Sequence, residues 1–116
     1  MPAPSVDQLP LSVPVFQILL ALVDRDLHGY AIIKDVHARS GGALRLTASS
    51  VYGALARLLE AGLVGESPDP DDERRRLYHL TAPGRALLRR EVERMAAAVR
   101  QAQERRLVPQ SRNLRS

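Results

Sequence analysis

Two arginine-containing segments have residue types that suit the binding of a polyanion. Arg74, Arg75 and Arg76 are consecutive, and Arg57 lies among small and polar residues. A guanidinium offers a planar fork of donors that matches the acceptors of phosphate and guanine better than an ammonium does. The net charge of +4 and the pI of about 10.3 are consistent with a polyanionic partner. A biased base composition in the gene would also enrich arginine, but along the whole chain. The positions of the arginines must therefore distinguish such a bias from a binding site for a polyanion.

The residue types that other chemistries need are missing or scattered. The chain of 116 residues has no cysteine, which excludes disulfides, thiolate metal ligands and cysteine nucleophiles and fits a reducing compartment. The histidines, His28, His37 and His79, lack the spacing of metal ligands. The sequence contains no glycine-rich phosphate loop, no GxSxG motif and no paired catalytic carboxylates on a recognisable frame. We therefore expect no catalytic residue, no metal, no cofactor and no enzymatic activity.

Arg57 belongs to a segment with the pattern of a surface helix. Thr47 is a favourable N-cap residue and Gly62 a favourable stop. Apolar residues recur at the spacing of a helix face that covers a core, at Val51, Leu55, Leu58 and Leu59. The opposite side carries Ser49, Ser50, Gly53, Ala56 and Arg57. These residues are small or polar apart from one long cation, so another surface can approach this side closely.

Two further helices are expected before this segment. Residues 14–23 are apolar on nearly every side, which is typical of a buried helix. A second helix is expected over about 28–39, because its apolar residues recur on one face and Ser40-Gly41-Gly42 stops it. The apolar run over 13–23 is too short to span a bilayer, and residues 1–4 show no basic region of a signal peptide. We expect a soluble, cytoplasmic protein that does not enter the membrane.

The consecutive arginines begin the second strand of a predicted hairpin. Strands are expected over 63–67 and 74–80, and residues 68–72 have the composition of a turn. Four acidic residues lie beside the arginines, namely Asp69, Asp71, Asp72 and Glu73. Carboxylates at the tip would repel a polyanion, so we expect the returning strand to approach phosphate. In the free protein the acids are expected to pair with the arginines.

The last predicted helix has the pattern of a coiled coil. Thr81 is its expected N-cap residue, and Pro109 ends any helix. Apolar residues alternate at spacings of four and three along it, at Leu88, Val92, Met95 and Val99. The stripe could pack on the chain's own core, but it continues past the point that one small domain could cover. A partner helix, supplied by a second copy in a homodimer, is the simpler account.

Three helices followed by a hairpin predict a mostly α fold with a small β-hairpin, a winged helix-turn-helix with a C-terminal dimerisation helix. We expect a flexible arm over 1–10, a DNA-binding domain over 11–81, the dimerisation helix over 82–107 and a flexible tail over 108–116. In this architecture the third helix enters the major groove and the hairpin, or wing, lies against the adjacent backbone or minor groove. Double-stranded DNA is then the expected partner.

Three ordered motifs resemble those of PadR-type transcriptional regulators. Leu27-His28-Gly29-Tyr30 contains an HGY motif, residues 50–64 resemble the LYxALxRLExxGLI stretch, and residues 75–84 resemble the RRYYxLTxxG segment. The match covers about residues 11–88. The resemblance implies a dimeric DNA-binding repressor, often released by a small molecule. Leu77 departs from it, since the family often has a tyrosine there, and the short segment after the wing allows one C-terminal helix, as in the smaller members.

The expected DNA contacts come from the third helix and the wing. They are Thr47, Ser49, Ser50, Tyr52, Gly53, Arg57, Arg74, Arg75 and Arg76, and the expected dimerisation residues are Leu88, Val92, Met95 and Val99. Arg57 is expected to contact bases or phosphate, and the wing arginines phosphate. Tyr52 could reach a phosphate with its hydroxyl or pack its ring on the second helix. The serines could bind phosphate or simply cap the helix.

Two functions remain open at this point. One is a homodimeric transcriptional regulator that acts as a repressor on a palindromic operator, which a small apolar or aromatic effector can release. The other is a winged-helix protein-interaction module without DNA binding. The outer face of the third helix discriminates between them, because a protein-binding face should expose large apolar groups.

Overall fold

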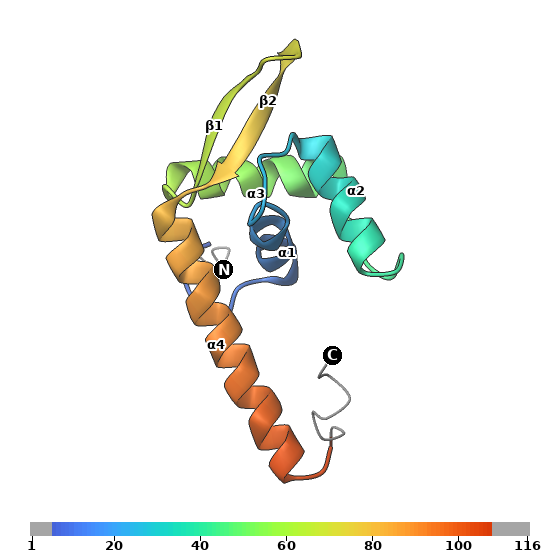
Figure 1. Ribbon diagram of the computed structural model, residues 1–116, viewed down its shortest axis with the longest axis vertical. Coiled ribbons are helices and arrows are strands. Elements are labelled where there is room, and N and C mark those ends of the chain that lie inside the picture. The colour runs from blue at the N-terminus through green and yellow to red at the C-terminus, as the bar shows by residue number, and fades with distance from the viewer. Residues whose placement is uncertain (1–5, 108–116) are drawn as a thin grey trace.

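The structure, a computed structural model, describes residues 6–107. It contains α1 (Val13–Ala21), α2 (Gly29–Arg39), α3 (Ala48–Glu60), β1 (Val64–Asp69), β2 (Asp72–Leu80) and α4 (Ala82–Glu104). Figure 1 shows α3 crossing beneath the hairpin of β1 and β2, with α1 and α2 beside it and α4 leading away from the body. The predicted three helices, hairpin and C-terminal helix are confirmed.

Each helix begins where a side chain accepts a hydrogen bond from the first turn. Thr47 Oγ1 accepts from the Ser50 N–H, and Thr81 Oγ1 accepts from the Gly84 N–H, as the sequence predicted for these two caps. His28 Nδ1 accepts from the Ala31 N–H at 3.2 Å, which makes it the cap of α2. These bonds satisfy amide groups that have no partner within the helix, and they fix where α2, α3 and α4 start.

The core lies where α1, α2 and α3 meet, and it is aliphatic. Its fully buried members include Ile18 and Leu19 from α1, Ile32 from α2, and Leu55 and Leu58 from α3. The apolar stripe predicted for α3 therefore faces inward, apart from Leu59, which is only partly buried. Because one side of α3 is committed to this core, its other side is held toward solvent.

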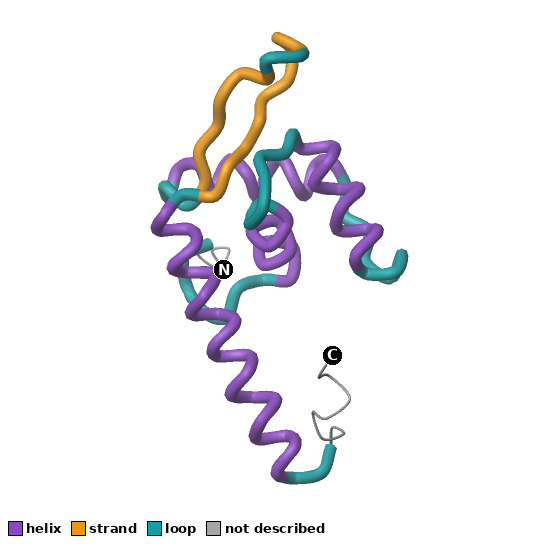
Figure 2. The backbone as a smooth tube through the Cα atoms, viewed as in Figure 1, coloured by secondary structure: helices purple, strands orange, loops and turns teal. Residues whose placement is uncertain are grey.

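The hairpin is longer than the sequence predicted. β1 and β2 pair antiparallel from Val64 opposite Leu80 to Asp69 opposite Asp72, with a register shift next to Asp69. Figure 2 shows the two strands rising together from the body to a short loop. The sequence predicts a turn over residues 68–72 because proline and aspartate are unfavourable in strands, so it does not predict the ends of the two strands. These residues are acceptable in a strand beside a bulge.

The first part of α4 belongs to the core. Leu87 and Leu88 are buried, and Gly84 packs so closely on the Leu63 carbonyl that a larger residue would clash with it. Farther along, Val92 and Val99 are 45% and 46% exposed. In Figure 1 this C-terminal half of α4 extends away from the other helices. The heptad stripe therefore begins inside the domain and ends outside it.

The segment before α1 is tied to α4 through Glu91, which is buried. Its Oε2 accepts from the Leu11 N–H at 2.8 Å, and its Oε1 accepts from Arg94 Nε at 2.6 Å. The bonds from Arg94 lower the pKa of Glu91 below its ordinary value of 4.5, an effect that burial opposes and the Leu11 N–H reinforces. Val6 also packs on the core. Residues 1–5 of the expected arm and residues 108–116 lie outside the described residues.

Replacing Glu91 by alanine is expected to lower the free energy of unfolding by about 1–3 kcal/mol, because the Leu11 N–H loses its acceptor. The folded state favours the ionised carboxylate, so the charge-dependent contribution is complete above pH 4.5 and is lost as the pH falls through the lower folded-state pKa. Denaturant unfolding at neutral and acidic pH measures it. Glu93→Ala, on an exposed position of α4, is the control, and equal stability of the two variants at neutral pH would contradict this role.

Candidate nucleic-acid interface

The outer side of α3 presents a polar surface with one cation. Thr47, Ser49, Ser50 and Arg57 are exposed, and Gly53 is half-buried. The Arg57 side chain lies close to Gly53, because a Cβ atom added to Gly53 would be 3.8 Å from Nη1 of Arg57. Among residues 6–107 no carboxylate forms an ion pair with Arg57. A helix of this width fits the major groove, and Arg57 is its longest donor.

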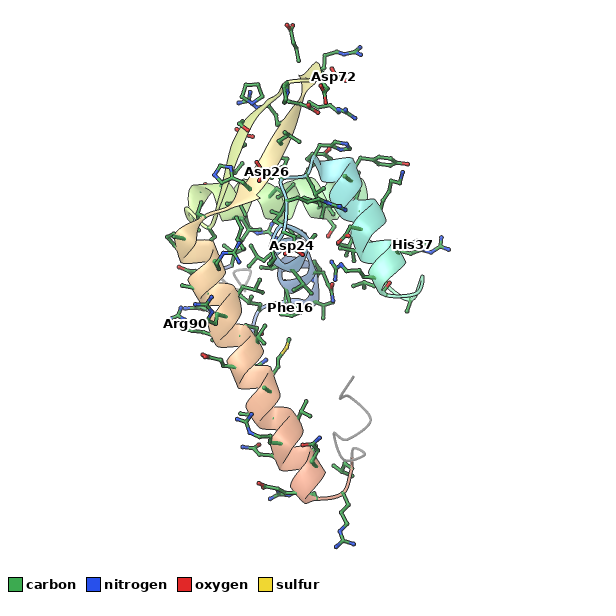
Figure 3. The ribbon with its side chains drawn as sticks, in the orientation of Figure 1. Phe16, Asp24, Asp26, His37, Asp72 and Arg90 are labelled. Carbon is green, nitrogen blue, oxygen red and sulfur yellow. The ribbon has the colours of Figure 1, made fainter. Side chains whose placement is uncertain are left out.

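The three wing arginines differ in how strongly the protein engages them. Arg74 is 91% exposed, with one contact from its Nε to Asp72 Oδ1 at 3.5 Å. Arg76 is half-exposed and pairs with Glu66 across the hairpin at 3.6 Å. Arg75 contacts Asp69 and Asp72, which lies toward the tip of the wing (Figure 3). The predicted pairing of tip carboxylates with arginines is confirmed for Asp69 and Asp72, and Glu66 joins them.

All three tyrosines of the chain line one small cleft between α2, α3 and β2. The cleft has a volume of about 190 Å³ and is lined by His28, Tyr30, Tyr52, Arg74, Arg75, Arg76 and Tyr78. Burial raises the pKa of Tyr78, and the nearby Glu66 adds to this. The hydroxyl therefore stays protonated and can act as a donor. Phenolic and guanidinium donors on one concave surface suit a phosphate.

Tyr52 packs its ring against α2, as one of the two interpretations of the sequence held. A side chain larger than hydrogen at Gly29 would collide with this ring. Tyr52 is nevertheless 47% exposed, and it lines the cleft. Packing on Gly29 thus orients the phenol without removing it from solvent.

The N-terminal end of α2 adds donors that the sequence analysis did not include. Tyr30 is 62% exposed, and Lys34 Nζ lies 5.6 Å from its ring centroid. Both line an open hollow of about 590 Å³ together with Arg25 and Arg75. No local pattern joins residues 30, 52 and 78, because they meet only when the wing folds over α2. Their residue type was the one available signal, since the chain has no other tyrosine.

The expected dimerisation residues fall into two groups. Leu88 is buried in the chain's own core, whereas Val92 and Val99 are exposed and Met95 is half-buried on α4. The apolar surface that α4 leaves exposed therefore begins at Val92. Within residues 6–107 no three histidine, aspartate or glutamate side chains gather as ligands for a metal. The same residues contain no helix that is both long and apolar enough to cross a membrane.

Comparison with known proteins gives a family match over most of this fold. Residues 18–90 match the model of the transcriptional regulator PadR-like family. A curated relative, an uncharacterised 37.1 kDa protein of a transposon from Streptomyces fradiae, is 47% identical over 79 residues, which are 68% of this chain and 22% of that protein. The chain thus spans about a fifth of the length of that relative.

Solved structures share the fold. A probable transcriptional regulator from Pseudomonas aeruginosa is 27% identical, with a TM-score of 0.65 over 79% of this chain and 64% of that one. The PcaV transcriptional regulator from Streptomyces coelicolor is 32% identical, with a TM-score of 0.60 over 74% of this chain and 58% of that one. Bacillus subtilis PadR, solved in complex with operator DNA, is 24% identical, with a TM-score of 0.64 over 72% of this chain and 48% of that one.

Proposed function

The chain belongs to the PadR-like family of transcriptional regulators, and from this we propose that it is a homodimeric DNA-binding repressor. In this proposal α3 enters the major groove, the wing and the N-terminal end of α2 contact the adjacent backbone, and α4 joins two copies. Residues 11–81 form the DNA-binding domain and residues 82–107 the dimerisation helix. The family and the structural relatives named above are transcriptional regulators, which provides no basis for an enzymatic activity.

The observation that carries the proposal is the combination of the polar outer side of α3 with the donors beside it. The proposed DNA contacts are Thr47, Ser49, Ser50, Tyr52, Gly53, Arg57, Arg74 and Arg76. Arg75 of the predicted set also lies on this surface, but it is already paired with Asp69 and Asp72. Tyr52 is the one large apolar group that α3 exposes, and it ends in a hydroxyl. A face of this kind suits base edges and phosphate better than a protein partner, which disfavours the interaction-module alternative.

A two-fold dimer would present two copies of α3 to the duplex. We propose a palindromic operator with half-sites about one or two DNA turns apart, roughly 10 or 20 base pairs. Support for the homodimer comes from the exposed apolar residues of α4, Val92 and Val99. Support for action on an operator comes from the fold relative that was solved with operator DNA.

A selection of genomic fragments with the purified protein tests this function directly. We expect enrichment of a palindrome, followed by much tighter binding of that duplex than of its scrambled sequence in fluorescence titrations. Titrating the scrambled duplex at the same salt concentration controls for sequence-independent binding. No enrichment, or equal affinity for both duplexes, would reject the proposal and favour the interaction module.

We also propose that a small apolar or aromatic effector releases the operator by binding between the DNA-binding domain and α4 of a dimer. Its support is the family resemblance together with the concave apolar space that dimer interfaces near a hinge provide. A panel of phenolic and cationic lipophilic compounds is expected to contain one that lowers operator affinity. The measurement is operator titration with and without each compound, with scrambled duplex as the control. If operator affinity is indifferent to the whole panel, the protein is a constitutive repressor.

A further inference from the structure

Arg75 differs from its neighbours because the wing itself already satisfies its charge. Its Nη2 lies 3.3 Å from Asp69 Oδ2, and its Nε lies 3.6 Å from Asp72 Oδ2. Its Nη1 lies 3.3 Å from His28 Nε2. A neutral imidazole has one acceptor nitrogen, and His28 uses Nδ1 to cap α2, so the two carboxylates are what hold the guanidinium. The fork of donors that would grip a phosphate is therefore occupied.

The burial and hydrogen bonding of Asp69 hold its carboxylate in place beside Arg75. It is 6% exposed, the least exposed acid of the wing, and its Oδ1 accepts from the Asp71 N–H at 2.9 Å. If Arg75 moved to a phosphate, this enclosed carboxylate would lose its counter-ion and face the negative backbone. Moving Arg74 or Arg76 to a phosphate would leave no such enclosed carboxylate unpaired. Each of these two arginines has one carboxylate contact, longer than the 3.3 Å between Arg75 and Asp69, and each is at least half exposed. Arg74 and Arg76 line the same cleft as Arg75, so both remain available to a phosphate beside it.

We propose that Asp69 is a specificity-determining residue that withholds Arg75 from the DNA backbone. The wing then binds phosphate through Arg74 and Arg76, and its sequence-independent affinity is lower than three arginines would produce. Because specificity is the ratio of operator to non-operator affinity, limiting backbone contacts leaves more of the binding energy to the bases read by α3. This inference rests on the proposed DNA-binding function.

A double-mutant cycle on the full chain tests it, with affinities for operator and scrambled duplex measured over a salt series. Arg74→Ala and Arg76→Ala should each lower the salt slope by about 0.9 per subunit, the value for one phosphate contact, whereas Arg75→Ala should leave it unchanged. Asp69→Asn keeps an acceptor for the Asp71 N–H and removes the charge. It should steepen the slope by about 0.9 per subunit and tighten scrambled-duplex binding about two- to fivefold.

The steeper salt slope and tighter scrambled-duplex binding expected for Asp69→Asn must depend on Arg75. Asp69→Asn combined with Arg75→Ala should therefore return to the wild-type slope. Glu73→Gln removes an equal charge from an exposed wing residue that pairs with no arginine among residues 6–107, so it should not steepen the slope. If Asp69→Asn fails to fold by circular dichroism, Asp72→Asn removes the second carboxylate that contacts Arg75. Because Asp72 also contacts Arg74, this variant is made in the Arg74→Ala background and compared with Arg74→Ala alone.

The outcomes separate the two proposals. A wild-type protein that binds no duplex refutes the proposed function. If wild-type protein binds its operator but the single variant Arg75→Ala lowers the salt slope by about 0.9 per subunit, only the withholding role is refuted. An Asp69→Asn slope equal to that of wild type refutes that role as well.

Discussion

Replacing both Val92 and Met95 by glutamate is expected to leave the protein monomeric at micromolar concentration. Val92 is 45% exposed on the part of α4 that extends away from the body, and Met95 lies one turn farther along the same stripe. In a two-helix seam these positions face their counterparts on the partner helix. Carboxylates buried there without partners would weaken the dimer by several kcal/mol.

The choice of these two positions follows from where α4 is buried. Leu88 belongs to the predicted stripe but lies in the chain's own core, so a charge there would unfold the domain and report nothing about assembly. Val92 and Met95 avoid this, because the core residues of α4 precede them. Far-ultraviolet circular dichroism should therefore show a folded double variant.

Multi-angle light scattering measures the result. Arg90→Glu combined with Arg100→Glu is the matched control, because it adds two carboxylates to exposed positions of α4 off the stripe and should stay dimeric. A Val92→Glu, Met95→Glu variant that remains dimeric at micromolar concentration would reject the stripe as the interface. A monomeric variant should also lose the cooperative grip on two half-sites that a palindrome requires.

The fold could be predicted from the sequence because its signals are local. Thr47 and Thr81 mark helix starts by hydrogen bonds that span three residues. The spacing of Val51, Leu55 and Leu58 assigns the inner face of α3, and all three are buried. Local sequence also places Arg57 on the exposed side, because residues of α3 outside the buried apolar stripe face solvent.

The tyrosine cleft and the Glu91 anchor could not be predicted, because they depend on contacts between distant segments. Tyr30 and Tyr78 share the cleft only through the docking of the wing on α2. Glu91 sits in a charged run on α4 that has the composition of a solvated face, yet the segment before α1 covers it and Leu11 donates to it. A periodic pattern shows which face of a helix is apolar, but not which polar residue a remote segment will bury.

The wing shows the same limit in its electrostatics. Proximity in sequence predicted that acids and arginines would pair, and Asp69 and Asp72 do so with Arg75. Glu66 was not among the predicted partners, because its contact with Arg76 crosses the hairpin and depends on the register of the strands. Regular pairing runs from Val64 opposite Leu80 to Pro68 opposite Arg76, and the composition of residues 68–72 predicted a turn where this ladder continues.

Arg57→Ala is expected to weaken operator binding by about 1–3 kcal/mol, or roughly 5- to 150-fold, and to relax preference at particular bases. Its guanidinium is exposed on the outer side of α3 and forms no ion pair among residues 6–107, so the full set of donors is available. Bidentate contact with guanine is the commonest specific use of arginine in the major groove. The loss should therefore depend on which base pair is present.

Competition titrations with operators that carry single base-pair changes measure that dependence. Wild-type protein should discriminate at one position of each half-site where the Arg57→Ala variant does not. Arg89→Ala, which removes the same charge from an exposed position of α4, should keep both affinity and preference. Unchanged operator affinity in Arg57→Ala would exclude α3 as the reading element. An equal loss on operator and scrambled duplex would instead make Arg57 a phosphate contact, because a backbone contact carries no sequence information.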